Sequence, residues 1–296
     1  MYHEWPAAIE HTTVWTSRAE CPREDHLVLP DGCMDLLWLN GELVVAGPDT
    51  AAYQATWTSA SYIGLRFSAG IGRRVIGVPV YELRDQRIPL AQIWPSNQVR
   101  RLTERLAGAA ATPDRLYGAW PAESWAAVDA YFQTHDPARS DDRATRHDDR
   151  SVLVDQGVST QARILEKVAI SKLRDSSPPD PVAEYTAQML GQGKSVESVA
   201  EAVGFSARQL HRRSVDAFGY GPKMLARILR LNRALDLGRL GRSPAEVAFV
   251  TGYSDQAHLA REVRSLTGLT FTSLVAPLAT SWAAAADPGL ETSRAS

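Results

Sequence analysis

Cysteine is scarce in this chain of 296 residues: Cys21 and Cys33 are the two that it has. Two cysteines cannot make a disulfide scaffold, so we expect a reducing compartment. No apolar run approaches the roughly 18 residues that a membrane-spanning helix needs. The first residues carry acids and no apolar stretch, so we expect no signal peptide. The sequence therefore predicts a soluble, cytoplasmic protein without a membrane partner.

Excess charge of one sign is also lacking, since the formal net charge is only −2. That average hides an asymmetry: residues 180–280 hold 12 Lys and Arg against 9 Asp and Glu, while the remainder holds 20 against 25. The asymmetry favours a polyanionic partner for the C-terminal part. The hydrophobic share of 44% excludes a mainly disordered chain, and the length suits two domains.

Short runs rich in β-branched and aromatic residues fill the N-terminal part, at 11–17, 26–29, 33–39, 42–47 and 61–68. In the last run Ile63, Leu65 and Phe67 alternate with Gly64 and Arg66, which is typical of a half-buried strand. The residues at 40–42, Asn-Gly-Glu, predict a hairpin. We therefore interpret residues 1–96 as a β-rich domain, a small barrel or a sandwich.

Helical spacing replaces the strand pattern from residue 97, and we assign residues 97–177 to a helical connector or dimerisation region. Apolar residues at helical spacing recur near 99–106, 125–132 and 164–173. Residues 136–150 hold five Asp, four Arg and no large apolar residue, which predicts a solvated loop. Residues 176–181 predict a stiff linker, 178–280 a further domain, and 281–296 a flexible tail.

An internal repeat occupies that further domain. The segment SVESVAEAVGFSARQL (195–210) returns as SPAEVAFVTGYSDQAHL (243–259), with one extra residue after the aromatic position. Each copy predicts a short helix capped by Ser195 or Ser243, a left-handed Gly204 or Gly252, a core aromatic, and a second helix capped by Ser206 or Ser254. Val247 and Val250 are expected to form the apolar stripe of the second copy. This pattern is that of a helix-turn-helix, and its duplication strengthens the prediction.

The second helix of each copy exposes residue types that recognise base edges in the major groove. From the residues we expect outward side chains at Arg208, His211, Arg212 and Arg213 in the first copy, and at Gln256, His258, Arg261 and Arg264 in the second. A helix over 223–238 joins the copies, with Arg227, Arg230 and Arg233 along one side. Those arginines either hold phosphates or lie over the core, and both interpretations stay open.

Residues 180–278 resemble the DNA-binding domain of AraC/XylS-type transcriptional regulators, most closely in EVAFVTGYSDQAHLAREVRSLTGLT (246–270). The resemblance implies two recognition helices in successive major-groove segments, roughly 34 Å apart. It places base contacts at Arg208, His211, Arg212, Gln256, Ala257 and Arg261. Two positions depart from the family: Ser214 replaces a buried aromatic residue, and Phe271 replaces a proline.

Residues 29–50, 64–72 and 77–90 resemble the N-terminal domain of a subgroup of the same family. This resemblance implies a cupin-like β-barrel with appended helices, used for effector sensing or dimerisation. Within such a barrel Trp15, Trp38, Tyr62 and Phe67 are candidates for an apolar effector pocket, or else belong to the core. The fold class is therefore α+β: a cupin-like β-barrel with helices, followed by an all-α double helix-turn-helix domain.

Enzyme chemistry finds little support. His26, Asp31, Cys33 and Asp35 match no metal-ligand spacing, and apolar neighbours make Cys33 an inert thiol. We expect no catalytic residues, no metal and no cofactor. The predicted function is a sequence-specific transcriptional regulator bound to double-stranded DNA, with a homodimer, a small-molecule effector and RNA polymerase as further expected partners. Two alternatives stay open: cysteine- or metal-based chemistry in the barrel, and a ligand-free dimerisation module.

Overall fold

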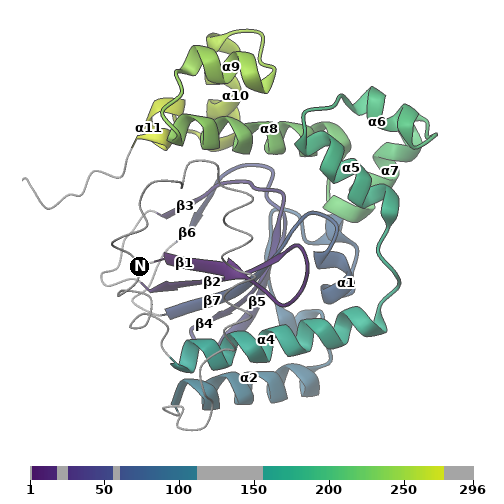
Figure 1. Cartoon of the computed structure of the whole chain (residues 1–296). Helices are drawn as coiled ribbons and strands as arrows, with labels where there is room; N and C mark the ends of the chain where they lie inside the picture. The colour runs from purple at the N-terminus through teal and green to yellow at the C-terminus, as the bar shows by residue number, and fades with distance from the viewer. Residues whose placement is uncertain (1, 19–25, 56–60, 112–155, 277–296) are drawn as a thin grey trace, which may run out of the picture.

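The computed structural model describes residues 2–18, 26–55, 61–111 and 156–276 (Figure 1). They form a mixed α/β protein, with a β-sheet part followed by helices that end in two helix-turn-helix units. The predicted loop at 136–150, the helix near 125–132 and the tail at 281–296 lie outside the described residues. Among the described residues, no helix is both long and apolar enough to span a bilayer.

Six strands form an antiparallel sheet in the order β1-β2-β7-β4-β5-β8, and β3 pairs with β6 in a separate two-stranded sheet. The strands are β1 (Tyr2–Pro6), β2 (Thr12–Arg18), β3 (His26–Val28), β4 (Met34–Leu39), β5 (Glu42–Ala46), β6 (Tyr53–Ala55), β7 (Ser61–Phe67) and β8 (Arg87–Pro89). Because β1 and β8 remain edges, the described strands do not close into a barrel, and the cupin-like barrel is not confirmed.

The predicted hairpin joins β4 to β5. Asn40 and Gly41 both have positive φ, 48° and 84°, which is the backbone of the tight hairpin turn that Asn-Gly favours. All five predicted strands are present, whereas β1, β6 and β8 were not predicted. The short strands β6 and β8 lie outside the runs of β-branched and aromatic residues on which the prediction rests.

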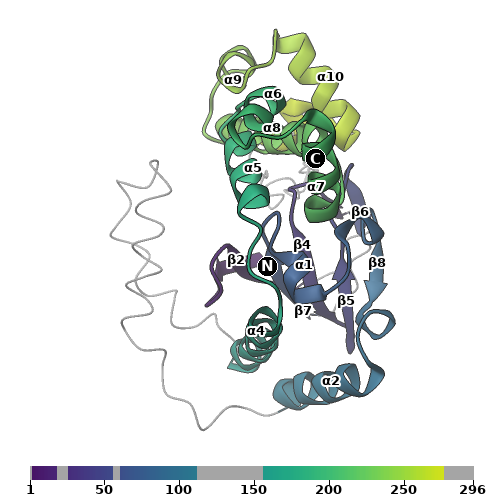
Figure 2. The same ribbon diagram turned by 90° about the vertical axis from the view of Figure 1, so that its right-hand side faces the viewer.

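One face of the six-stranded sheet carries the core. Leu36, Leu65 and Phe67 are fully buried there, against α2 (Ser96–Ala111) and α4 (Gln156–Asp175). Both helices lie along this side of the sheet in Figures 1 and 2. Gln161 of α4 donates from Nε2 to the Leu106 carbonyl oxygen of α2 at 2.9 Å. The two helices of the predicted connector therefore share the core of the sheet.

Short helical segments link the sheet to these helices: α1 (Gly72–Ile76), η1 (Val80–Glu82) and η2 (Leu90–Gln92). After α4 come α5 (Pro181–Gly191), α6 (Val196–Ala202), α7 (Ala207–Phe218), α8 (Pro222–Arg239), α9 (Pro244–Thr251), α10 (Gln256–Thr267) and α11 (Phe271–Val275). The predicted linker is shorter than expected, because Asp180 already caps α5 and Pro181 begins it.

Helix α8 runs across the top of the sheet part in Figure 1 and carries one helix-turn-helix unit at each end. Leu225 and Ile228 belong to the core of the first unit, and Leu231 and Leu235 to that of the second. The middle of α8 also contacts the sheet part, since Asn232 donates from Nδ2 to the Pro30 carbonyl oxygen at 3.3 Å.

Candidate nucleic-acid interface

The first helix-turn-helix unit consists of α6 and α7. Ser195 caps α6, and its Oγ accepts from the Ser198 amide at 3.1 Å. Gly204 has a φ of 68°, and the chain reverses there without a Cβ penalty. Ser206 and Gln209 form a reciprocal capping box that begins α7. The predicted caps and turn of the first copy are confirmed.

The second unit, α9 and α10, begins with another capping box between Ser243 and Glu246. Gly252 ends α9 with a φ of 78°, and Tyr253 is buried beneath the turn. The predicted cap at Ser254 is wrong: Asp255 caps α10, accepting from the His258 amide at 2.6 Å. The second copy has one extra residue after its aromatic position, so the N-cap of α10 lies one residue farther from Tyr253 than the N-cap of α7 lies from Phe205. Of the expected apolar stripe, Val247 is fully buried, but Val250 is exposed, so the prediction is wrong at Val250.

On α7 the structure places Arg208, His211 and Arg212 at the surface. His211 lies with its ring over Gly221, where a Cβ would come within 2.5 Å of the ring. Arg213 is different, because it makes a two-pronged pair with Asp180, Nε to Oδ2 at 2.6 Å and Nη2 to Oδ1 at 2.7 Å. Arg213 therefore ties α7 to the start of α5 rather than facing solvent freely.

On α10 Gln256, Ala257, Arg261 and Arg264 are exposed. His258 is partly buried; its ring packs edge-on against Tyr253 and its Nδ1 lies 3.1 Å from Ser254 Oγ. Each recognition helix thus exposes long side chains that can form hydrogen bonds, and small exposed residues lie among them: Ala207 on α7, and Ala257 and Ala260 on α10. Such side chains suit base edges and phosphates. Their role in DNA binding stays a prediction.

Two of the arginines on α8 are engaged inside the domain. Glu262 on α10 accepts from Arg227 Nε and from Arg230 Nη2, both at 3.0 Å. Burial opposes ionisation of Glu262, but these hydrogen bonds outweigh it and hold its pKa below the usual value. Arg230 also lies over the Tyr253 ring, 4.5 Å from its centroid. Of the two open interpretations, the structure favours the internal one for Arg227 and Arg230.

The four aromatic residues proposed for an effector pocket lie on opposite faces of the sheet. Trp38 pairs across β4–β7 with Ile63, and both point into the helix-covered core with Phe67. Trp15 pairs with Gly64, on the other face, which Tyr62 shares. The four side chains therefore do not line one cavity. Gly64 is required beneath Trp15, since a Cβ there would come within 2.7 Å of the indole ring.

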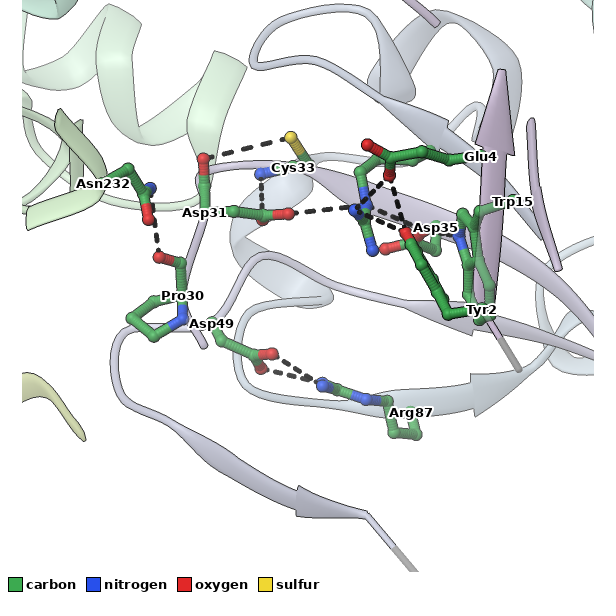
Figure 3. Close-up of polar contacts among 11 residues, drawn as sticks. Tyr2, Glu4, Trp15, Pro30, Asp31, Cys33, Asp35, Asp49, Arg87 and Asn232 are labelled. Carbon is green, nitrogen blue, oxygen red and sulfur yellow. Dashed lines mark hydrogen bonds and ion pairs between the residues drawn. The ribbon is translucent and has the colours of Figure 1, made fainter. Parts of the chain in front are cut away.

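The face that carries Trp15 also holds a charged cluster, drawn in Figure 3. Trp15 Nε1 donates to Asp35 Oδ1, and Arg66 Nε lies 3.4 Å from a carboxylate oxygen of both Asp31 and Asp35. Burial raises the pKa of Asp35 to about 6, against the opposing effect of Arg66. Asp31 also accepts from the Cys33 amide at 2.8 Å. The Asp31 carboxylate is thus committed to partners within the protein itself.

The alternative of metal or thiol chemistry gains nothing from these positions. Burial, with Asp31 nearby, raises the pKa of the Cys33 thiol well above its usual value, which disfavours a nucleophilic thiolate. Asp31 and Asp35 are both paired with Arg66. Within the described part of the chain, no group of three or more His, Cys, Asp or Glu residues is placed to hold a metal ion.

Two helix-turn-helix units on one connecting helix define a domain of the double helix-turn-helix class. Comparison with known families agrees: residues 185–276 match the family described as a helix-turn-helix domain, and residues 7–89 match a domain of unknown function (DUF6597). Over these residues the chain is similar to AraC/XylS-type regulators.

One curated relative is the uncharacterized HTH-type transcriptional regulator YbfI of Bacillus subtilis (strain 168), 30% identical over 90 residues. The match covers 28% of this chain and 33% of YbfI, so the chain spans about a third of the length of that relative.

Among solved structures, a probable AraC family regulator from Rhodopseudomonas palustris is similar, with a TM-score of 0.29 and 20% identity, over 32% of this chain and 95% of that one. ToxT from Vibrio cholerae O395 has a TM-score of 0.40 and 7% identity, over 92% of this chain and 96% of its own.

Some residues that shape the interface were not predicted. Asp180 and Glu262 position the recognition helices, yet neither stood out among the acids of the sequence. For Asp180 a signal existed, because Asp before Pro is typical of a helix N-terminus. For Glu262 there was none, since its partners are 32 and 35 residues away.

Proposed function

We propose that this chain is a sequence-specific DNA-binding transcriptional regulator. The observation that carries the proposal is the pair of helix-turn-helix units, each with arginines exposed on its second helix. Phosphate contacts would position the domain on the duplex, and outward side chains of α7 and α10 would specify bases. Arg208, His211 and Arg212 are the contacts proposed in the first unit, and Gln256, Ala257, Arg261 and Arg264 those in the second. Arg213 is proposed only as a support for α7.

We further propose the division of labour that the sequence predicts. Residues 1–96 would act as a β-rich, cupin-like sensory domain, 97–177 as connector or dimerisation region, and 178–280 as the DNA-binding domain. A small-molecule effector or a second copy of the chain would shift the population of DNA-competent arrangements. Under this proposal the protein works in the cytoplasm as a homodimer, contacts RNA polymerase, and is not an enzyme.

The test begins with selection of a preferred DNA site from a random duplex library by the full chain. Affinity is then measured on that site and on random DNA at several salt concentrations. Arg212→Ala and Arg261→Ala should each cost about 1–3 kcal/mol of discrimination between the two DNAs. Arg100→Ala, an exposed arginine on α2, is the matched control and should change neither affinity.

Three outcomes would change or overturn the proposal, each in a different way. Equal weakening on both DNAs would make Arg212 and Arg261 phosphate contacts instead of base contacts. Selection of no site by the full chain, followed by selection of one by residues 178–296, would show that the N-terminal part masks the interface. Failure of both to select a site would overturn DNA recognition itself.

A further inference from the structure

One short loop of the sheet part touches both recognition helices. Residues 48–52, here called the bridging loop, connect β5 to β6. At one end the Pro48 ring packs against Gly219, where a Cβ would lie 3.0 Å from Pro48 Cγ, directly after α7. At the other end the Ala52 amide donates to the Leu266 carbonyl oxygen at 2.8 Å, in the last turn of α10.

Hydrogen bonds hold the bridging loop to the sheet part along its length. Asp49 accepts from both terminal nitrogens of Arg87, at 2.8 and 2.6 Å, as Figure 3 shows. Thr50 donates to Asp85 Oδ1 from its amide at 2.7 Å and from its hydroxyl at 2.9 Å. The Asp85 amide in turn donates to the Pro48 carbonyl oxygen at 3.2 Å. The loop is therefore a fixed spacer.

The end of α7 has two more attachments to the sheet part. Arg84 donates from Nη1 to the Gly219 carbonyl oxygen at 3.3 Å. Arg73 of α1 forms an ion pair with Asp216, in the last turn of α7. In Figure 2 the lower end of α7 lies against this part of the protein. Each recognition helix is thus anchored at its C-terminal end.

These anchors leave the recognition surfaces open. Helix-turn-helix proteins contact bases mainly through the N-terminal residues of the recognition helix. In this chain Arg208, Arg212, Gln256 and Arg261 lie toward those N-terminal ends, and all four are exposed. The sheet part therefore constrains both helices without covering the side chains proposed to bind DNA.

The geometry limits how far apart the two anchored ends can lie. Five residues reach at most about 18 Å when extended, so the short loop limits the separation of the two contacts that it makes, with Gly219 and with Leu266. On B-DNA, one helical turn is about 34–36 Å and 10–10.5 base pairs, so each added pair moves a half-site by roughly 3.4 Å and rotates it by about 35°. A fixed pair of helices matches one spacing, whereas a loose pair tolerates several.

We propose that the bridging loop sets the separation and angle of the two recognition helices, and so determines which half-site spacing in DNA the chain accepts. The specificity-determining residues of this device lie in the N-terminal sheet part and touch no DNA. The inference rests on the proposed function, since it concerns how the two units share one DNA site.

The first experiment uses the full chain and DNA sites in which the selected half-sites are one base pair closer, unchanged, or one base pair farther apart. The wild type should bind the altered spacings at least about tenfold more weakly, comparable to the cost of a mismatched base pair. Ala52→Pro removes the amide that bonds Leu266, and the double variant Pro48→Ala/Arg84→Ala loosens the end of α7. We call the loss of affinity on sites of altered spacing the spacing penalty. In both variants it should fall to about threefold or less.

Matched controls separate this effect from general damage. Ala52→Ser keeps the amide and should keep the wild-type spacing penalty, and Arg100→Ala should do the same. Thermal unfolding checks that each variant is folded. If Ala52→Pro does not fold, the double variant decides the question at the other anchor.

A second experiment needs no DNA. Spin labels are placed by Arg208→Cys and Gln256→Cys in a chain with Cys21→Ser and Cys33→Ala, and the distance between labels is measured. The distribution should be narrow with the intact loop and broader with either loosening change. Unchanged spacing penalties or unchanged distance distributions in the loosened variants would overturn this inference and leave the proposed function in place. A wild type with a narrow distribution but no preferred DNA site would overturn the proposed function instead.

Discussion

Replacing Glu262 by Ala should weaken the attachment of α10 to α8. Glu262 is the shared acceptor of Arg227 and Arg230, and its side chain is 12% exposed against 34% and 29% for theirs. A buried hydrogen bond to a charged group contributes about 1.5–3 kcal/mol, and the partial exposure of both arginines screens part of that. Glu262→Ala removes the carboxylate that accepts hydrogen bonds from both arginines. We therefore expect the free energy of unfolding to fall by about 2 kcal/mol.

The assay is urea unfolding of the full chain near neutral pH, followed by circular dichroism, since urea does not screen charges. Glu262→Gln keeps one acceptor oxygen and should lose about half as much. Glu201→Gln, on the exposed side of α6, should stay within about 0.5 kcal/mol of the wild type. A double-mutant cycle between Glu262→Ala and Arg227→Ala should show a coupling of about 1 kcal/mol or more.

The pH dependence gives an independent check. Because the folded pKa of Glu262 is lowered, its contribution is present above the unfolded pKa and is lost as pH falls through the folded value. Glu262→Gln should therefore lose less stability than the wild type on acidification. A loss below about 0.5 kcal/mol for Glu262→Ala, or additive effects in the cycle, would refute the assignment of Glu262 as the anchor of α10.

The remaining predictions concern the sheet part. Burial raises the pKa of Asp35 to about 6, so the folded chain binds more protons than the unfolded chain between about pH 4 and 6, and stability should fall by up to about 3 kcal/mol as pH rises through that window. The difference in unfolding free energy between the wild type and Asp35→Asn should follow this slope in urea titrations, and a difference that does not change with pH would contradict the prediction. Gly47→Ala would place a Cβ 1.7 Å from the Leu83 carbonyl oxygen, so the unfolding free energy should drop by about 2 kcal/mol or more. Gly108→Ala, with open space around it on α2, should instead gain up to about 1 kcal/mol, and equal effects of the two changes would contradict the packing at Gly47.

The C-terminal domain could be predicted well because its signals are local. Ser195 and Ser243 cap helices through bonds to residues three positions away, and Gly204 and Gly252 need positive φ whatever surrounds them. Because the domain is a repeat, each of these local signals occurs in both copies, and each copy supports the prediction made from the other. The boundaries of α8 followed from helical spacing alone and are extended by only one residue at each end, to Pro222–Arg239.

The side-chain roles proved harder, because they depend on residues far along the chain. Arg212 and Arg213 are adjacent arginines, so the sequence does not distinguish them. Only the position of Asp180 in the fold shows that Arg213 is paired within the protein. In β2, Val14 and Trp15 are both apolar, so the sequence does not show which of them faces the core. The strands β1 and β8 are edge strands recruited by pairing, and their own sequences contain Pro and charged residues.

The division of α8 between two cores has a consequence for engineering new specificities. A chimera that exchanges one helix-turn-helix unit for that of a relative must cut α8. The cut falls between Ile228, which belongs to the core of the first unit, and Leu231, which belongs to the core of the second. Arg227 lies on the first-unit side of that cut, yet its carboxylate partner, Glu262, belongs to the second unit. The exchangeable module is therefore not the unit as the repeat defines it: a graft must carry Arg227 along with its new α10.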